Sequence, residues 1–182
     1  FPDSSDKAAR FIWTCNAFNI PLLFLQDIPG FMVGSQVERA GMIRHGAKML
    51  FAVAEARVPR IAVLVRKAYG GGYLAMSGSP MGPDAVLALP TAKPALMGPE
   101  SAINAIYLNK IMELPEEQRA AFIDAKRREY EEDIDVYEVA SDFSIEAVIP
   151  SDELRDELIR RYEIYCRKDV PPHNRRNGVI PV

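Results

Sequence analysis

Short apolar runs framed by proline or glycine recur along the chain and predict buried strands. They occupy residues 22–25, 61–65, 85–89 and 95–97. Continuous apolar stretches of about four to eight residues between turn signals are typical of strands buried on both faces. Because segments with helical spacing separate these runs, the pattern predicts an α/β fold in which helices cover a sheet.

The helical segments are expected from apolar residues that recur every three or four positions. Phe11, Ile12, Cys15 and Phe18 predict an opening helix, for which residues 4–6 offer N-cap oxygens. A long helix is expected over residues 35–56. Its predicted buried stripe consists of Ile43, Ala47, Leu50 and Ala54.

The second half of the chain is more highly charged. Helices are expected to begin near Pro99, Pro115 and Ser151, where proline or acidic residues suit a first turn. The charged helical segment at about 114–135 is assigned to the same domain as the rest, so that residues 1–182 form one domain. The tail at residues 171–178 is expected to be turn-like and loosely packed.

Composition and charge exclude several classes of function. The chain has 182 residues and a net charge of −3, without a dense block of Lys and Arg, which argues against a nucleic-acid partner. No apolar run approaches the ~20 residues that a membrane-spanning helix needs. Cys15 and Cys166 form no CxxC pair, which favours free thiols in a reducing compartment, the cytoplasm or a mitochondrial matrix. The chain begins with Phe1, so we expect a piece of a longer polypeptide.

Two glycine-rich turns are the main candidates for chemistry. Residues 66–73 (Arg-Lys-Ala-Tyr-Gly-Gly-Gly-Tyr) follow the apolar run 61–65, and residues 27–34 (Asp-Ile-Pro-Gly-Phe-Met-Val-Gly) follow the run 22–25. Glycine allows positive φ and close approach of a ligand to the backbone. The first amides of a following helix lack partners and can stabilise an anion. The two turns therefore predict a site built from main-chain atoms.

Other chemistries fit the sequence less well. Gly70–Ala75 matches the G-x-G-x-x-G/A dinucleotide pattern, but no acid lies about 20 residues beyond it to hold a ribose. With only His45 and His173 available, and with Ser77 outside a G-x-S-x-G elbow, a nucleophilic triad is not expected. No His/Cys spacing suggests a metal site.

Two points remain open from the residues alone. The glycines could serve only as structural corners, since glycine clusters commonly do. Arg44, Arg66 and Lys67 lie near the turns, where they could contact an anionic cofactor or could simply be solvated.

These turns, together with residues 43–48 (Ile-Arg-His-Gly-Ala-Lys), closely resemble the C-terminal half of the carboxyltransferase (β) subunit of biotin-dependent acyl-CoA carboxylases, such as propionyl-CoA carboxylase. The similarity continues through residues 90–92, 97–98, 145–150 and 177–181 and covers nearly the whole chain. It implies a crotonase-like (ClpP/crotonase) fold of repeated ββα units.

The resemblance also implies a reaction and its partners. Carboxybiotin on a carrier protein gives its carboxyl group to the α-carbon of an acyl-CoA, and a backbone oxyanion hole stabilises the biotin enolate. An N-terminal carboxyltransferase half, which supplies most of the CoA site, a biotin carboxylase and a biotin carrier subunit are the implied partners. A homo-oligomer is expected, and the isolated chain should be inactive or nearly so.

Site residues follow from the resemblance by motif. The expected oxyanion-hole amides are those of Gly71 and Gly72, and Leu74 is expected in the substrate pocket. The expected biotin-binding residues are Gly30, Phe31, Gly34, Gly70 and Tyr73, with no metal.

Two alternative functions and the identity of the acyl group stay open at this point. The same chemistry could run in reverse, as in a biotin-dependent decarboxylase of the glutaconyl-CoA type. The chain could instead be a non-catalytic assembly domain of such a complex. Leu74 also leaves the acyl group undecided, because the resemblance associates an acid at this position with propionyl-CoA and an aliphatic residue with acetyl-CoA.

Overall fold

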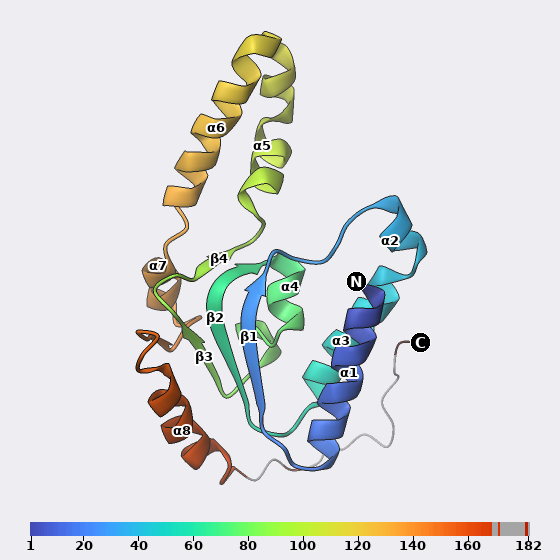
Figure 1. Ribbon diagram of the computed structural model, residues 1–182, viewed down its shortest axis with the longest axis vertical. Coiled ribbons are helices and arrows are strands. Elements are labelled where there is room, and N and C mark those ends of the chain that lie inside the picture. The colour runs from blue at the N-terminus through green and yellow to red at the C-terminus, as the bar shows by residue number, and fades with distance from the viewer. Residues whose placement is uncertain (169–170, 172–180, 182) are drawn as a thin grey trace.

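The computed structural model of the protein describes residues 1–168, 171 and 181 and shows a parallel sheet between layers of helices (Figure 1). The described strands are β1 (Leu22–Ile28), β2 (Arg60–Tyr69), β3 (Ala85–Ala88), β4 (Lys93–Ala95) and β5 (Ala147–Val148). The described helices are α1 (Pro2–Ala17), α2 (Ser35–Arg39), α3 (Met42–Glu55), α4 (Gly70–Ala75), the 3₁₀ helix η1 (Ser79–Met81), α5 (Pro99–Glu113), α6 (Glu116–Glu132), α7 (Val136–Ser141) and α8 (Leu154–Tyr165).

All strand pairings in the described sheet are parallel. The strand order is β1-β2-β3-β5, and β4 pairs with the end of β2. Parallel strands are normally buried on both faces, and β3 is buried at every position. This explains the continuous apolar runs of β2 and β3. The expectation of burial on both faces is wrong for β1, in which Leu22 and Phe24 are buried but Leu23 and Leu25 are 41% and 54% exposed.

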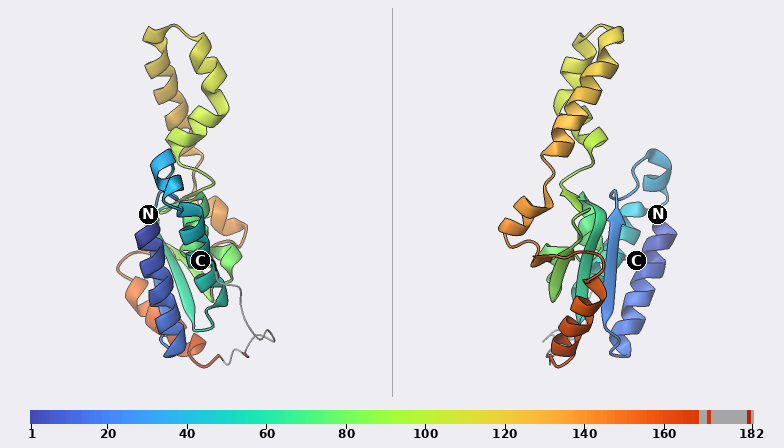
Figure 2. Two further views of the ribbon diagram at one scale, coloured as in Figure 1. Left: turned by 90° about the vertical axis from the view of Figure 1, so that its right-hand side faces the viewer. Right: turned by 60° about the vertical axis from the view of Figure 1, so that its left-hand side comes forward.

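The core lies on both faces of the sheet. On one face Ala62 and Leu64 of β2 pack with α1 and α3. On the other face Ile61 and Val63 of β2 pack with α8, through Leu154, Leu158 and Tyr162. Two views of the ribbon show α1 and α3 together on one side of the sheet and α8 on the other (Figure 2).

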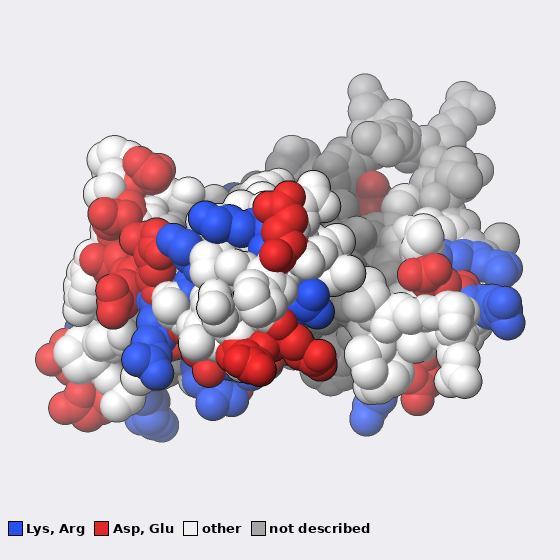
Figure 3. Space-filling view, turned by 90° about the horizontal axis from the view of Figure 1, so that it is seen from above, with Lys and Arg blue, Asp and Glu red and all other residues white. Residues whose placement is uncertain are grey.

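Helices α5 and α6 form an arm that projects beyond the sheet (Figures 1 and 2). They pack on each other, with the rings of Tyr107 and Phe122 edge to face at 5.8 Å between centroids. The hydroxyl of Tyr130 donates to the carbonyl of Met97 at 3.0 Å and fastens the base of the arm. Seen from above, acidic and basic side chains are interspersed over this end of the molecule (Figure 3).

The expected strands at residues 22–25, 61–65 and 85–89 and most helix starts are confirmed, whereas the strand expected at 95–97 lies earlier, at Lys93–Ala95. The long helix expected over residues 35–56 is wrong. It is divided into α2 and α3 at Gly41, whose φ of 86° lies in the left-handed region that interrupts a helix. The predicted stripe is wrong as well. Ile43 is 83% exposed and Ala54 is also exposed. The buried residues of α3 are instead Met42, Gly46, Met49, Ala52 and Val53.

The opening helix is confirmed, with two differences. It already begins at Pro2, so the expected N-cap residues 4–6 lie inside its first turns and Ser5 is buried there. Ile12 and Cys15 face the core, whereas Phe11 and Phe18 are 62% and 73% exposed. The expected turn-like tail lies outside the described residues, apart from Pro171.

Candidate functional site

Both glycine turns lie at the carboxyl ends of neighbouring parallel strands. The segment that begins at Pro29 follows β1, and Gly70 follows β2 directly, with β1 and β2 paired along their lengths. In open parallel α/β sheets, ligands bind outside the carboxyl ends of the strands. The topology therefore brings the two turns together at the carboxyl ends of the strands.

The register between β1 and β2 contains an irregularity just before these turns. Gln26 pairs with Leu64, but Ile28 pairs with Ala68, so β2 has two extra residues between the paired positions. Such a bulge re-aims side chains near the end of a strand. Here it places Arg66 beside Asp27.

Asp27 of the first turn and Arg66 of the second form a bidentate ion pair. Arg66 donates to its carboxylate from Nε, at 3.1 and 3.2 Å, and from Nη2, at 2.8 Å. The backbone N–H of Lys67 donates to the same carboxylate at 3.2 Å. These hydrogen bonds hold the pKa of Asp27 below its usual range, with the Arg66 side chain as the largest cause. The ion pair is solvent-exposed, so its chief role is to position the turns.

The glycines of the two turns pack directly against each other. A Cβ added to Gly72 would lie 2.9 Å from the Cα of Gly30 and 3.0 Å from Cγ1 of Ile28. A Cβ on Gly71 would lie 2.9 Å from the ring of Phe31, which also covers Gly46 of α3. Only residues without side chains allow this close approach.

Gly70 makes the junction between β2 and α4. Its φ is +50°, and a Cβ at this position would lie 2.8 Å from the carbonyl oxygen of Leu96. The three glycines that were expected to form a turn are the first turn of α4 itself. The N–H groups of a first helical turn have no partner within the helix, and Gly71 is exposed whereas Gly72 is buried.

A largely apolar cavity of about 730 Å³ adjoins this helical turn. Gly70, Gly71 and Leu74 line it on the side of α4, and Leu96 and Met97 line it opposite. A volume of this size lies within the range of small-molecule pockets. The cavity therefore offers apolar walls next to the amide of Gly71.

Tyr73 lines the cavity and also supports its wall. Its hydroxyl accepts a hydrogen bond from the backbone N–H of Ser79 at 2.8 Å, and its ring fills the space beside Gly78. Burial raises the pKa of the Tyr73 hydroxyl. The side chain thus stays neutral near pH 7 and holds the loop after α4 in place.

The structure brings most of the residues expected from the sequence together and leaves one apart. Gly30, Phe31, Gly70, Gly71 and Gly72 meet at the junction of the two turns, and Tyr73 and Leu74 face the cavity. Gly34 lies at the N-cap of α2, where a Cβ would meet no atom within 4 Å.

Arg60 is an organising residue that the sequence pattern did not reveal. It begins β2 with only 7% of its surface exposed. Its guanidinium donates to the carbonyls of Val53 at 2.7 Å and Gly82 at 3.0 Å, and its backbone N–H donates to Asp84 at 2.8 Å. Burial lowers the pKa of Arg60. One buried cation therefore ties the end of α3 to the loop after η1.

His45 is a packing residue on the helix side of the sheet. Its Nδ1 lies 2.8 Å from the carboxylate of Asp6 on α1, which also lies 2.9 Å from Nζ of Lys48. Hydrogen bonds from His45 and Lys48, in that order, lower the pKa of Asp6. His173 lies outside the described residues.

The described residues contain no metal-binding cluster and no membrane-spanning helix. In the part of the chain that the structure describes, no group of three or more His, Cys, Asp or Glu side chains could hold a metal ion. Among the same residues, no helix combines the length and apolar character required to cross a membrane. Cys15 is buried and Cys166 exposed, and both are free thiols.

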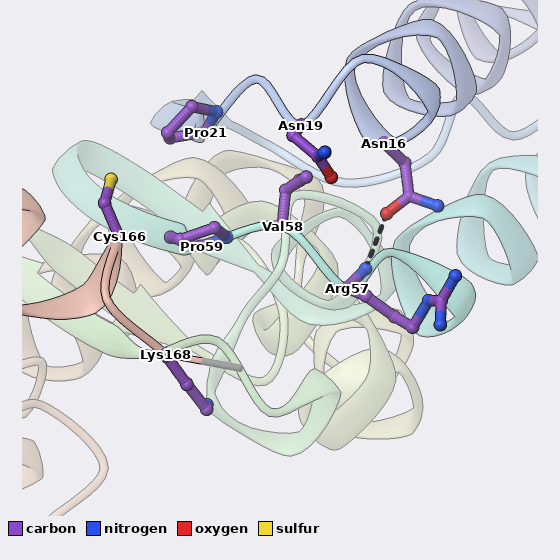
Figure 4. Close-up of a pocket in the computed structure, with 8 residues that line it drawn as sticks. All are labelled: Asn16, Asn19, Pro21, Arg57, Val58, Pro59, Cys166 and Lys168. Carbon is purple, nitrogen blue, oxygen red and sulfur yellow. Dashed lines mark hydrogen bonds between the residues drawn. The ribbon is translucent and has the colours of Figure 1, made fainter. Parts of the chain in front are cut away.

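A second cavity, of about 420 Å³, lies at the opposite ends of the strands. Asn16 and Asn19 contribute from the end of α1, and Arg57 and Pro59 contribute from the loop before β2 (Figure 4). The side chain of Asn16 accepts a hydrogen bond from the backbone N–H of Arg57 at 2.7 Å. This corner is held by a structural hydrogen bond and contains none of the expected site residues.

Comparisons with known proteins agree on one family. The model of the carboxyl transferase domain matches residues 1–180. The uncharacterized carboxylase YngE of Bacillus subtilis (strain 168) is 60% identical over 182 residues, which are 100% of this chain and 36% of that protein. The methylmalonyl-CoA decarboxylase subunit alpha of Propionigenium modestum is 41% identical over 181 residues, 99% of this chain and 35% of that protein.

A solved structure gives the same result for the fold. The crystal structure of transcarboxylase 12S, described as a hexamer assembly with methylmalonyl-coenzyme A and methylmalonic acid bound, superimposes with a TM-score of 0.87 at 42% identity. The match covers 100% of this chain and 34% of the 12S chain. It confirms the expected crotonase-like α/β fold. The chain spans about a third of the length of the relatives that it matches.

Proposed function

The chain belongs to the carboxyl transferase domain family, and we propose that it provides the biotin-facing part of an enzyme that transfers a carboxyl group between biotin and an acyl-CoA. The observation that carries this proposal is the contact between the two glycine turns. Gly30 lies against Gly72, and Phe31 lies over Gly71, at the rim of an apolar cavity. This arrangement offers backbone donors and no catalytic acid or base.

The residues fit the cofactor that the family implies. Biotin has a planar, neutral ureido group on an apolar bicyclic ring, and it needs hydrogen-bond donors beside apolar walls. Gly71, an exposed residue in the first turn of α4, and the ring of Phe31, which lies beside it, would supply these two features. When bound, carboxybiotin supplies the carboxyl group that is transferred.

The chain's own residues would position the ligand and stabilise charge. The amides of Gly71 and Gly72 would donate to an oxygen on which negative charge develops, with the dipole of α4 in the same direction. Gly30, Phe31, Gly34, Gly70 and Tyr73 are proposed to form the biotin side. Because this proposal needs no protein base, it suits a region whose one described histidine pairs with Asp6.

Leu74 is proposed to face the acyl group. It lies in the wall of the apolar cavity together with Leu96 and Val139. An apolar wall favours an aliphatic acyl chain over one that carries a charge, because an unpaired buried charge is costly. The acyl chain itself is left to experiment.

The test compares Gly71→Pro with Gly71→Ala in the assembled enzyme that contains this chain. Both variants introduce a Cβ at the point that lies 2.9 Å from Phe31, but only proline removes the amide N–H. Loss of one oxyanion donor typically costs about 3 kcal/mol, so we expect kcat for Gly71→Pro to be about 100-fold below that of Gly71→Ala. The isolated chain is expected to be inactive.

The controls separate folding from catalysis. Urea unfolding of both variants must show similar free energies of unfolding for the kinetic comparison to count. Equal transfer rates in two folded variants would contradict the oxyanion assignment. They would favour the alternative in which this chain is a non-catalytic assembly domain.

A second candidate runs the same chemistry in reverse. It is suggested by the 41% identity to a methylmalonyl-CoA decarboxylase subunit alpha, which equals the identity to a putative propionyl-CoA carboxylase beta chain. The two directions share the same site, so the structure has no feature that would serve only one of them. Decarboxylation of methylmalonyl-CoA by the assembled enzyme, without ATP-dependent carboxylation of propionyl-CoA, would identify the reverse direction.

The proposed partners are those of a biotin-dependent complex. They are an N-terminal carboxyltransferase half, a biotin carboxylase with its biotin carrier, and further copies of the same chain. The cytoplasm, or the mitochondrial matrix in a eukaryote, is the proposed location. Purification of the complex from cells with a tag on this chain would test these partners directly.

A further inference from the structure

Gln26 is a fully buried polar side chain within β1. Its Nε2 donates a hydrogen bond to the backbone carbonyl of Met76 at 2.7 Å. Met76 is the C-cap of α4, the short helix whose first turn contains Gly71 and Gly72. The last carbonyls of a helix have no partner within the helix. Gln26 therefore supplies, from a neighbouring strand, a donor that α4 itself lacks.

A second contact fixes the other end of α4 to the same strand. Cγ1 of Ile28 lies 3.0 Å from the position that a Cβ on Gly72 would occupy. Gln26 and Ile28 are two residues apart, so their side chains lie on the same face of β1. Two strand residues span about 7 Å, and the six residues of α4 span about 9 Å. The helix thus runs back along β1, which holds it at both ends.

Backbone hydrogen bonds close the end of α4 in a strained conformation. The N–H groups of Ser77 and Gly78 donate to the carbonyls of Leu74 and Tyr73, both at 3.0 Å. This pattern is a Schellman motif, which places a left-handed residue directly after the helix. Ser77 takes this position, with a φ of 62° and no exposed surface. A non-glycine residue keeps such a φ only when its surroundings enforce it, and Gln26 contacts the preceding residue.

The hydrogen bond of Gln26 adds little net stability. Among the described residues, its buried Oε1 has no hydrogen-bond partner. An unpartnered buried acceptor costs at least as much free energy as one hydrogen bond contributes. An apolar side chain of similar length would remove this acceptor but would leave the Met76 carbonyl without its donor, so the two effects offset each other. The hydrogen bond therefore fixes the position of α4 more than it stabilises the fold.

We propose that Gln26 is a positioning residue, which holds the end of α4 so that the amides of Gly71 and Gly72 point at the oxygen on which negative charge develops. This inference rests on the proposed function. A short helix moves as a unit, so a displacement of its end also displaces the amides at its start. Preorganised donors stabilise a developing charge only at the correct distance, and a misplacement of about 1 Å can cost about 100-fold in rate.

The first test compares Gln26→Met with the wild type in the assembled enzyme that contains this chain. Methionine is a flexible side chain that fills the space without a donor. We expect kcat to fall about tenfold and KM for the acyl-CoA to change less than about twofold, because the weakened interaction belongs to the transition state. The urea midpoint should change little. Hydrogen exchange with mass spectrometry should show faster exchange in residues 70–76.

Tyr162→Phe is the matched control. It also removes one side-chain hydrogen bond to a main-chain carbonyl, that of Leu22 at 2.6 Å. Leu22 begins β1, so this bond lies away from α4. We expect the kcat of Tyr162→Phe and its exchange in residues 70–76 to match the wild type. A similar loss of kcat in Gln26→Met and in the control would overturn the proposal, because any lost hydrogen bond would then have the same effect.

Gln26→Glu adds a pH signature. A neutral carboxylic acid can donate to the Met76 carbonyl, whereas a carboxylate cannot. Burial raises the pKa of a carboxyl group, so the donated hydrogen bond is present below that pKa and is lost as the pH rises through it. The kcat of Gln26→Glu relative to the wild type should therefore increase as the pH is lowered from about 8 to about 6. A ratio that is independent of pH would contradict the role of the donor.

The outcomes separate this inference from the proposed function. If Gly71→Pro has a lower kcat than Gly71→Ala, but Gln26→Met keeps the wild-type kcat and the wild-type exchange in residues 70–76, only the positioning role is overturned. If the two Gly71 variants transfer at equal rates, the oxyanion assignment fails and the positioning role fails with it. A loss of kcat in Gln26→Met with faster exchange in residues 70–76, and with the control unchanged, supports the proposal.

Discussion

At the scale of single residues, Tyr162 links the stability of the chain to alkaline pH. Its hydroxyl donates to the carbonyl of Leu22 at 2.6 Å and so fixes α8 to the start of β1. Burial raises the pKa of Tyr162 to about 12, and neighbouring Cys166 and Asp84 act in the same direction. A phenol ionises near pH 10 in an unfolded chain. The stability contributed by the protonated hydroxyl is therefore complete below pH 10 and is lost as the pH rises to about 12.

Comparison of Tyr162→Phe with the wild type checks this expectation. At pH 8 the variant should be less stable by about 1 kcal/mol, the net value of one hydrogen bond. The difference should shrink as the pH is raised from 10 to 12, because only the wild type loses a proton there. Urea unfolding at a series of pH values measures it, and a difference that is constant to pH 12 would contradict the assignment.

Other residues show what the sequence could not reveal at this scale. The glycine turns were predicted because the backbone freedom of glycine is a property of the residue itself and does not depend on its tertiary contacts. The structural role of Arg60 was not predicted. This role depends on hydrogen bonds to the carbonyls of Val53 and Gly82, which only the tertiary fold brings close to it. The hydrogen bond from Gln26 to Met76 was equally hidden, because it depends on how α4 lies along β1.

At the scale of elements, the α5–α6 arm should open more easily than the body. No residue of α6 is buried, and the arm is held by the Tyr107–Phe122 contact and by Lys110, whose Nζ lies 5.4 Å from the centroid of Phe122. Each such aromatic interaction is worth about 0.5–1 kcal/mol. Phe122→Ala should therefore lower the amide-exchange protection of the arm by about tenfold and leave β2 and β3 unchanged.

Hydrogen exchange with mass spectrometry measures both regions in one experiment. Phe143→Ala is the control, because Phe143 is 91% exposed and lies outside the arm. If Phe122→Ala lowered protection equally in β2 and β3, the arm would unfold together with the body and would not be an independent unit.

The positions of helices and strands were predicted better than the faces that these elements bury. Three of the four expected strands and most helix starts depend on local signals, and the structure confirms them, whereas the strand expected at 95–97 lies at Lys93–Ala95 and β5 was not predicted. The buried face of α3 was predicted from an apolar stripe. Because a new helix begins after Gly41, Met42 and Met49 face the core and Ile43 is exposed. Gly46 had no apolar signal at all, yet it is buried because Phe31 packs on it. The face of a helix that is buried depends on the elements that pack against it, and the spacing of apolar residues does not identify those elements.

At the scale of the whole molecule, β1 leaves one edge of the sheet open. In the described sheet β1 pairs with β2 alone. Leu23 and Leu25 point away from the α1–α3 face and are 41% and 54% exposed. Leu23 also borders an apolar groove of about 530 Å³ along α8, in which Ile159 is 44% exposed. An unpaired edge next to exposed apolar side chains favours pairing with another chain.

The isolated chain is therefore expected to self-associate through this edge, and Leu25→Lys should weaken the association. Burial of one leucine is worth about 1.5–3 kcal/mol, so the dissociation constant should rise by more than about tenfold. A lysine on an edge strand also opposes strand pairing directly. Sedimentation velocity over a range of concentrations measures the change, with Phe143→Lys as a control for added charge at an exposed apolar position away from β1. A wild type that stays monomeric at high concentration would contradict association itself, and equal effects of the two lysines would place the contact elsewhere.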